Sequence, residues 1–307
     1  METPIPMNEM LSNACTMIRG THAAAGMDLL TSSLDRLRSL SSNEEWGILR
    51  QVALSHPIID ALHQCPLTSR AYRKPRGYPG DAVLIDLIYS DVSVGGVDIS
   101  DIGRQVYNYC FNAAQCRSVR SRLEIVSHAI DECAKRGGAH ILSVACGHLR
   151  EAALSEAVGS RCFAAFHAVD QDLESLAEVD RCCRSLGVIP MAGSVIDIIK
   201  RRLTGLDAYD LVYAAGLYDY LNDKVAALLT RELFHLLRPG GRLLIGNFRP
   251  GVFGTGYMET YMDWLLIYRD NASLYELIRL IPPASLATAE HFTDADGVVG
   301  YLLVTRS

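Results

Sequence analysis

Two short segments of this chain carry the residue types and spacing of a nucleotide-cofactor site. Residues 141–147 form a largely apolar run that ends in Gly147, and residues 166–170 form a second run that ends in Asp170. A glycine after a strand lets a ligand approach the backbone, and unpaired N–H groups of a following helix can bind it. A carboxylate ending the next strand can accept hydrogen bonds from ribose hydroxyls. Together the segments predict a nicotinamide dinucleotide or an adenosyl cofactor.

Two features favour the adenosyl cofactor. Gly147 is the only glycine of its turn, whereas the dinucleotide pattern G-x-G-x-x-G brings the backbone close to a pyrophosphate at several points. Near the end of the chain, residues 287–292 and 298–305 are apolar segments joined by a short turn containing Asp-Gly, which predicts an antiparallel hairpin. A doubly wound dehydrogenase sheet has no reason to carry such a hairpin, so the dehydrogenase interpretation is weakened.

The elements that must position these residues alternate along the chain. After Gly137-Gly138, short apolar runs alternate with helical stretches, as expected for a parallel sheet covered on both faces. The predicted strands are 139–145, 162–169, 188–193, 208–215 and 241–247, with helices that begin near Arg150, Leu173, Val195 and Asn222. With the terminal hairpin, this predicts an α/β, Rossmann-like domain over 136–307 with a mostly parallel, seven-stranded sheet.

The first part of the chain has helical apolar spacing and predicts an all-helical domain over 1–135. Ser41-Ser42 followed by Glu44-Glu45 is a capping-box start for a helix that Pro57 interrupts. The stretch 70–81 combines two prolines, two glycines, two tyrosines and four cations, so it predicts a loop that either lines a site or connects helices. The segment 249–283 is too long for an ordinary loop and predicts a helical cap over the active site.

Four motifs within 137–307 resemble, in order and spacing, those of the class I S-adenosylmethionine-dependent methyltransferases. They are Ser143-Val-Ala-Cys-Gly147, Val169-Asp170, Asp210-Leu-Val-Tyr-Ala and Leu237-Arg-Pro-Gly-Gly-Arg-Leu-Leu. The chain departs from the family pattern at Ser143, Ala145 and Leu149, where an acid and two glycines are common. The resemblance therefore implies that the methionine end of the cofactor is held differently here.

A narrower resemblance covers more of the chain and concerns the bacterial methyltransferases of extracellular factor (3-hydroxypalmitic acid methyl ester) biosynthesis. Its motifs are Arg76-Gly-Tyr-Pro-Gly-Asp81, Val119-Arg-Ser-Arg122, Ala215-Gly-Leu-Tyr-Asp-Tyr-Leu221 and Trp264-Leu-Leu-Ile-Tyr-Arg269. That family is heterogeneous, so the resemblance implies a reaction type better than a substrate.

The resemblance also implies which residues bind S-adenosylmethionine, with S-adenosylhomocysteine as the product. Gly147 and the neighbouring backbone would meet the methionine part, and Asp170 would meet the ribose. Ser194 and Val195 would contact adenine. The full implied set is Tyr78, Ala145, Cys146, Gly147, His148, Asp170, Gln171, Ser194, Val195, Ala215, Gly216 and Leu217.

Methyl transfer from a sulfonium is an in-line displacement, so positioning can supply much of the acceleration without a nucleophilic residue. A carboxylate acceptor needs no base, whereas a phenol, hydroxyl or amine would be helped by one. Catalytic candidates by position are Tyr218, Asp219 and Glu259. Substrate-binding candidates are four aromatic residues on one predicted helical face and two arginines, namely Tyr257, Tyr261, Trp264, Tyr268, Arg120 and Arg269. The aromatic face could instead pack on the helical domain.

We therefore expect a methyltransferase that acts on a small molecule, by O-methylation and with a carboxyl group as one candidate acceptor. N-methylation of a small amine or heterocycle is the alternative. A protein that binds the cofactor without turnover is the alternative from another class. The helical domain could serve as a lid, a substrate-binding unit or the interface of a homodimer, and its tyrosine-rich loop favours the lid.

Composition bounds the partners and the compartment. The net charge of −6 lacks the excess of cations that nucleic-acid binding needs. Nine cysteines without a C-x-x-C pair argue against a disulfide framework and a metal site, so we expect no metal and a reducing compartment. The start of the chain, Met1 to Pro6, lacks the basic and apolar regions of a signal peptide, and no apolar run is long enough to span a membrane. A cytoplasmic location is the expectation.

Overall fold

The computed structural model describes residues 7–90, 98–206 and 208–307, and the start of the chain considered above lies outside them. The chain forms two units. The helical unit comprises Met1–Val119 and Gly251–Leu265, and the sheet unit comprises Arg120–Pro250 and Leu266–Ser307. This division differs from the predicted boundary after residue 135, because helix α8 (Ala114–Ala134) contributes to both units.

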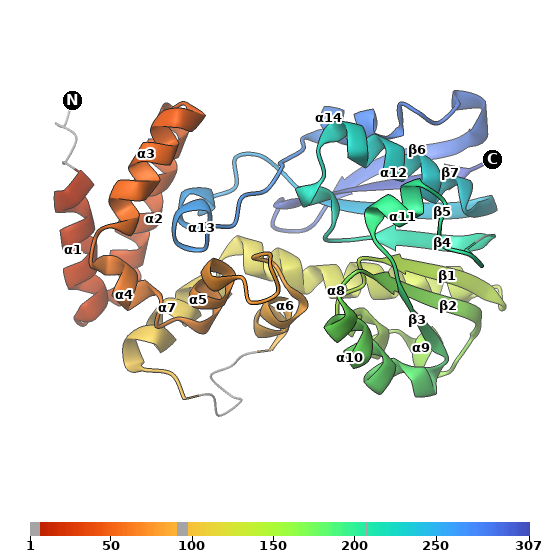
Figure 1. Cartoon of the computed structure of the whole chain (residues 1–307), viewed down its shortest axis with the longest axis horizontal. Coiled ribbons are helices and arrows are strands. Elements are labelled where there is room, and N and C mark those ends of the chain that lie inside the picture. The colour runs from red at the N-terminus through yellow and green to blue at the C-terminus, as the bar shows by residue number, and fades with distance from the viewer. Residues whose placement is uncertain (1–6, 91–97, 207) are drawn as a thin grey trace. The chain divides into compact units, whose positions relative to one another are not determined.

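The sheet unit contains the seven-stranded sheet that the sequence predicts (Figure 1). The strands are β1 (Ala139–Val144), β2 (Phe163–Asp170), β3 (Val188–Ala192), β4 (Tyr209–Ala214), β5 (Leu237–Phe248), β6 (Leu286–Thr293) and β7 (Val299–Arg306). Their order is β3-β2-β1-β4-β5-β7-β6, and only the pairings of β7 are antiparallel. The predicted closing hairpin is therefore confirmed. Strand β5 begins before the predicted residue 241, because the Arg238-Pro-Gly-Gly turn is absorbed by a register shift against β4.

Helices cover the faces of this sheet. They are α9 (Glu156–Gly159), α10 (Leu173–Cys183), α11 (Val195–Ile199), α12 (Asp223–His235) and α14 (Asn271–Tyr275). The helix predicted from Arg150 is instead a 3₁₀ turn, η1 (Arg150–Ala153), followed by α9. A second helix start arises there because the Ser155 hydroxyl caps it, accepting the Val158 N–H at 3.2 Å.

The core of the sheet unit explains why these strands are apolar throughout. Adjacent residues Ile141 and Leu142 of β1 are both fully buried, so both faces of the strand are covered. Leu142 and Val212 pack with Leu233 of α12 and Leu274 of α14 in one cluster. A central strand buried on both sides fixes the position of the loop that follows it.

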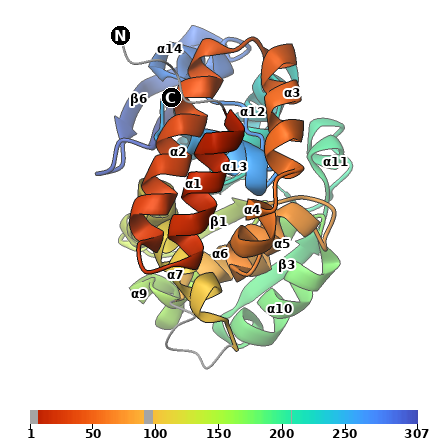
Figure 2. The ribbon, with the colours of Figure 1, turned by 90° about the vertical axis from the view of Figure 1, so that its left-hand side faces the viewer.

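The helical unit consists of short helices, several of which lie side by side in Figure 2. They are α1 (Met7–Arg19), α2 (Ala23–Leu40), α3 (Asn43–Leu54), α4 (Ile58–Leu62), α5 (Pro66–Arg73), α6 (Ala82–Tyr89), α7 (Asp101–Phe111) and α13 (Thr255–Tyr261). The predicted capping box is confirmed, since Ser42 and Glu45 bond reciprocally and α3 ends before Pro57. Within the described residues, no helix has the length and apolar character that crossing a membrane requires.

Two predictions about irregular segments need correction. Residues 70–73 of the predicted loop belong to α5, which starts with Pro66 and ends at Lys74, where φ is 48°. The loop itself is closed by a bidentate ion pair in which Arg70 donates to both carboxylate oxygens of Asp81 at 2.8 Å. The predicted cap at 249–283 is mostly not helical, because α13 ends at Tyr261 and the chain is irregular from there to α14. Trp264 and Tyr268 therefore do not share a helical face with Tyr257 and Tyr261.

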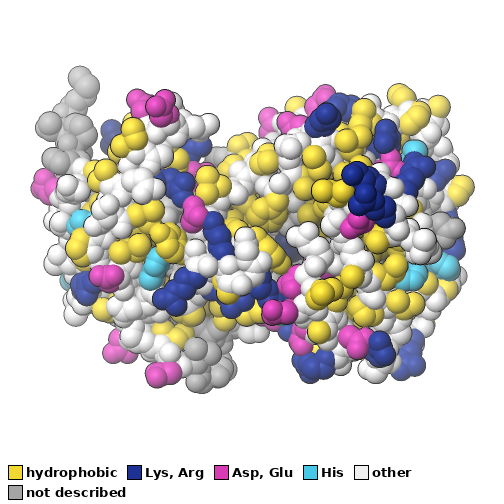
Figure 3. Space-filling view, viewed as in Figure 1, with side chains coloured by type: hydrophobic (Ala, Val, Ile, Leu, Met, Phe, Trp, Pro, Cys, Tyr) yellow, Lys and Arg dark blue, Asp and Glu magenta, His cyan; other side chains and the backbone are white. Residues whose placement is uncertain are grey.

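Charged side chains of both signs lie interspersed over the face of the sheet unit that Figure 3 shows. On α10, Arg181 pairs with Glu178, and Arg184, the residue after this helix, pairs with Asp180. Such a mixed surface fits the modest net charge of the chain.

Candidate functional site

The candidate site lies at the carboxyl ends of β1, β2 and β4, in the sheet unit. The strand order reverses between β1 and β4, which are neighbours in the sheet although β2 and β3 separate them in the chain. Ligands of open α/β sheets bind outside the strand ends at such a reversal. The residues predicted to bind the cofactor in the β1, β2 and β4 loops are brought to this edge.

The β1 loop has an unusual backbone. Ala145, Gly147 and Leu149 all adopt left-handed conformations, with φ of 54°, 53° and 51°. Only glycine does so without strain, and other residues pay about 1–2 kcal/mol. Ala145 and Leu149 stand where the family resemblance expects glycine, so the loop keeps the glycine-type conformation without the glycines. The Leu149 side chain is buried, and its packing offsets part of the strain.

Asp170 ties this loop to the end of β2. One carboxylate oxygen accepts the Gly147 N–H at 2.8 Å, and the other accepts the Asp172 N–H at 2.9 Å. Burial raises the pKa of Asp170, and the backbone hydrogen bonds oppose that shift. Each carboxylate oxygen has a second acceptor site. Asp170 can therefore fix the loop and still accept hydrogen bonds from a ligand hydroxyl.

The β4 loop lies against an arginine that the sequence did not single out as a site residue. Arg122 of α8 donates from Nη1 to the Ala215 carbonyl at 3.0 Å. A Cβ on Gly216 would stand 2.7 Å from the same nitrogen, so a side chain there would make the guanidinium shift. Arg122 lies in the motif Val119-Arg-Ser-Arg122, but the substrate role was predicted for Arg120, which is half-buried at the start of the sheet unit.

A second carboxylate stands near the β1 loop and was also missed. Glu151 of η1 is half-buried, and its Oε1 accepts a hydrogen bond from the Tyr213 hydroxyl at 2.8 Å. Tyr213 pairs in register with Ser143, the residue that replaces the expected acid. Burial raises the pKa of Glu151, and the positive charge of Arg122 opposes this. Burial also raises the pKa of Tyr213, so its hydroxyl remains a donor.

The catalytic candidates after β4 are held by the protein itself. The Tyr218 hydroxyl is buried at 2.9 Å from Thr230 Oγ1, and burial raises its pKa. Asp219 is buried and accepts the Phe248 N–H at 2.7 Å, and burial raises its pKa to about 6. Tyr218 therefore points into the core beside α12, while Asp219 joins the β4 loop to the end of β5.

Other predicted cofactor residues occupy the flanks of the site. Ser194 caps α11 through a reciprocal capping box with Asp197, and Val195 is the first residue of that helix. Gln171 is exposed immediately after β2. His148 is buried in the β1 loop, with Nδ1 at 3.4 Å from an Arg150 nitrogen. Cys146 is buried beside them, and burial raises the pKa of its thiol.

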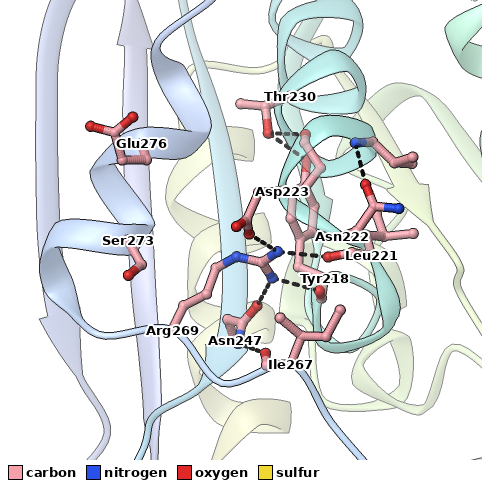
Figure 4. Close-up of polar contacts among 12 residues, drawn as sticks. Tyr218, Leu221, Asn222, Asp223, Thr230, Asn247, Ile267, Arg269, Ser273 and Glu276 are labelled. Carbon is pink, nitrogen blue, oxygen red and sulfur yellow. Dashed lines mark hydrogen bonds and ion pairs between the residues drawn. The ribbon is translucent and has the colours of Figure 1, made fainter.

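Arg269 has a structural role that the sequence did not predict. Its guanidinium is fully buried and donates to the carbonyls of Tyr218 and Leu221 at 2.8 and 2.6 Å. It also donates to Asn247 Oδ1 at 2.7 Å and to Asp223 at 2.8 Å (Figure 4). Four bonds to the protein hold together β5, the β4 loop and the start of α12, so we expect no substrate contact from Arg269.

The remaining predicted residues belong to the helical unit, apart from Tyr268, which follows it. Glu259 is buried and accepts hydrogen bonds from Arg38 at 2.9 Å and from Trp46 at 2.7 Å. The Tyr257 hydroxyl lies 2.9 Å from Thr68 Oγ1, and Tyr261 is fully buried. Trp264 is buried, and Tyr78 is half-buried in the loop before α6. These aromatic residues of α13 thus contribute to the core of the helical unit.

Comparisons with known proteins find likeness only at the level of structure. No family model matches the sequence, and no curated protein matches it. A possible exported protein from Bordetella parapertussis is 15% identical, with a TM-score of 0.59 and 99% of both chains covered. Magnesium protoporphyrin IX methyltransferase from Synechocystis, with bound S-adenosylhomocysteine, is 12% identical with a TM-score of 0.48, covering 73% of this chain and 99% of that chain.

A third likeness is to the N-methyltransferase NodS from Bradyrhizobium japonicum in complex with S-adenosylhomocysteine. It is 13% identical, with a TM-score of 0.43, and the match covers 64% of this chain and 89% of that chain. Both of these methyltransferase structures hold S-adenosylhomocysteine. The described residues of the sheet unit thus form a Rossmann-like α/β fold with the strand order β3-β2-β1-β4-β5-β7-β6 and a terminal antiparallel hairpin.

Proposed function

We propose that the protein binds S-adenosylmethionine at the carboxyl ends of β1, β2 and β4 and transfers its methyl group to a small molecule, most simply to an oxygen of a carboxylate. One observation carries this proposal: the Asp170 carboxylate bonds to the Gly147 N–H, so that an acid and a glycine-type loop stand together at the reversal of the strand order. The Asp170 carboxylate can accept hydrogen bonds from the two ribose hydroxyls of a nucleoside cofactor, and the glycine-type loop lets the neighbouring part of that cofactor pack against the backbone.

The residues present fit the cofactor. Ala145 is exposed in a left-handed loop, and Gly216 carries no side chain where one would collide with Arg122. The exposed Ala145 leaves backbone open to a ligand at the end of β1, whereas the Arg122 guanidinium fills the space that a side chain of Gly216 would take. Asp170 would hold the ribose, the backbone at Gly147 and Gly216 would border the methionine part, and Ser194 and Val195 would lie toward the adenine. The cofactor would supply an electrophilic methyl group on a sulfonium.

A carboxylate acceptor is supported by the state of two of the three catalytic candidates, Tyr218 and Glu259. The Tyr218 hydroxyl faces Thr230, and Glu259 is bonded to Arg38 and Trp46 inside the helical unit. A carboxylate is ionised near neutral pH and needs no proton acceptor. Under this proposal the protein binds and orients the acceptor and excludes water, and neither residue has to move a proton.

Calorimetric titration tests cofactor binding. We expect S-adenosylmethionine and S-adenosylhomocysteine to bind, NADH not to bind, and Asp170→Asn to weaken the adenosyl ligands by about 10- to 100-fold, the effect of losing hydrogen bonds to a charged group. Asp180→Asn on α10, whose carboxylate pairs with exposed Arg184, is the matched control and should bind as the wild type does. Tighter binding of NADH, or no adenosyl binding, would refute the proposal.

Transfer of labelled methyl groups tests the acceptor class. For carboxylic acids, we expect a rate that is flat from about pH 6 to pH 9, because the acceptor is already ionised. A rate that rises over this range with amines, and no transfer to acids, would support N-methylation instead. Cofactor binding without transfer to acids, phenols or amines would identify a binding protein without turnover.

A further inference from the structure

Ser143 leaves an electrostatic gap in the candidate site. The cofactor that we propose ends in an amino acid whose α-ammonium group is a cation at neutral pH. The family resemblance places an acid at the end of β1 to meet this part of the cofactor, but Ser143 is neutral and almost completely buried. An uncompensated cation at a half-buried site is unfavourable, so another anion has to take this place.

Glu151 is placed to supply the negative charge that Ser143 does not provide. It follows the β1 loop by two residues, and its carboxylate is bonded to the Tyr213 hydroxyl at 2.8 Å. Tyr213 stands on β4 directly opposite Ser143 of β1, so the hydrogen bond brings the Glu151 carboxylate toward the strand end that Ser143 leaves without charge. The loop residue Cys146 also lies within electrostatic reach of Glu151.

The environment of Glu151 keeps capacity for a further partner. A carboxylate offers about four acceptor positions, and Tyr213 and the Glu151 backbone N–H occupy two of them. Arg122 favours the ionised form of Glu151 from α8, and the same guanidinium is fixed against Ala215 and Gly216. Glu151 is half-buried rather than sealed in the core.

We infer that Glu151 is the residue that binds the α-ammonium group of the cofactor's methionine part, in place of the acid that the chain lacks at Ser143. Tyr213 and Arg122 are positioning residues for it. This inference rests on the proposed function, because it concerns how the same cofactor is held. If so, the residue that binds the amino-acid end of the cofactor lies in the turn η1 after the β1 loop, and not in the strand β1.

Two ligands separate this role from a structural one. S-adenosylhomocysteine carries the ammonium group, whereas methylthioadenosine has the same adenosine and sulfur without the amino-acid end. By calorimetry, Glu151→Gln should weaken S-adenosylhomocysteine by about 10- to 100-fold, the effect of a hydrogen bond to a charged group, and should leave methylthioadenosine unchanged. Tyr213→Phe should cause a smaller loss with the same selectivity for S-adenosylhomocysteine.

A second-site variant and a control complete the test. Ser143→Asp in the Glu151→Gln background should restore affinity for S-adenosylhomocysteine, because it returns an acid to the end of β1. Glu156→Gln, an exposed acid on α9, should bind both ligands as the wild type does. Equal weakening of both ligands by Glu151→Gln, or no weakening of either, would overturn the inference. Absence of S-adenosylhomocysteine binding to the wild type would instead refute the proposed function itself.

Discussion

The left-handed backbone at Ala145 makes a quantitative prediction about stability. Replacing Ala145 by glycine should relieve the roughly 1–2 kcal/mol that a side chain costs at a φ of 54°. Glycine also makes the unfolded chain more flexible, which costs about 0.4–1 kcal/mol. Because Ala145 is exposed, few contacts are lost. The expected net effect on the free energy of unfolding is a gain of up to about 1.5 kcal/mol.

Urea unfolding followed by circular dichroism measures this effect, and a matched control isolates the strain. Ala153 is also exposed and lies in the 3₁₀ turn η1, outside the left-handed region. Ala153→Gly changes the unfolded chain in the same way and should lower the free energy of unfolding by about 0.5–1 kcal/mol. The two variants should therefore differ by about 1–2 kcal/mol. Equal destabilisation by both would refute the reasoning that Ala145 is strained.

Three further predictions concern the loops around the site. Gly216→Ala should displace the Arg122 guanidinium, since its Cβ would lie 2.7 Å from Nη1, and should weaken binding of S-adenosylhomocysteine in calorimetry. Arg269→Met should lower the free energy of unfolding by about 2–6 kcal/mol, as measured by urea unfolding, because it leaves the buried Tyr218 carbonyl and Asn247 Oδ1 unpaired, at about 1–3 kcal/mol each. Asp219 has a pKa raised from 3.8 to about 6, so the folded state binds its proton more tightly and stability falls as pH rises through this range. Asp219→Asn should remove that fall, which amounts to about 2 kcal/mol between pH 4 and pH 7, and an unchanged pH dependence of unfolding would contradict the reasoning.

The strands and the centre of the site were predictable because their signals are local. Most of the predicted strands are short apolar runs between polar or glycine-containing segments. Such a run is enough to predict a parallel strand, because both faces of that strand are buried. Asp170 is the last residue of β2 and Gly147 lies three residues after the end of β1, so the chain order alone brings them to one edge of the sheet. The hydrogen bond between them agrees with that prediction.

The site residues that sequence reasoning missed depend on tertiary contacts. Glu151 gains its place through Tyr213, which is distant in sequence and meets it only because β4 lies next to β1. Arg122 and Arg120 are two residues apart on α8, so their side chains point in different directions. The local sequence feature that marks the position of the Arg122 guanidinium is Gly216, which has no side chain to block it. A glycine directly after a strand end could have drawn attention to a close approach of a large side chain.

The predicted aromatic face shows the opposite error, because a local pattern predicted a helix that is longer than the one in the structure. Helical spacing of four aromatic residues is real in the sequence, but the helix stops at Tyr261. Asp263 has a φ of 44° and pairs with Arg50 and Lys74, two cations far away in sequence. Ion pairs between residues far apart in sequence can end a helix, and the local spacing of apolar residues does not predict them.

The return of Gly251–Leu265 to the helical unit has a consequence for how the protein folds during synthesis. The Asp35 carboxylate accepts the N–H groups of Gly254 and Gly256, at 2.6 and 2.7 Å, and Glu259 supplies the partner of Arg38 and Trp46. This set of bonds cannot be complete until Glu259 has left the ribosome, by which time β1 to β5 are already available to pair. The helical unit, although it begins first, would thus be completed late. A fragment that ends near residue 135 would lack the segment that forms hydrogen bonds with Asp35, Arg38 and Trp46.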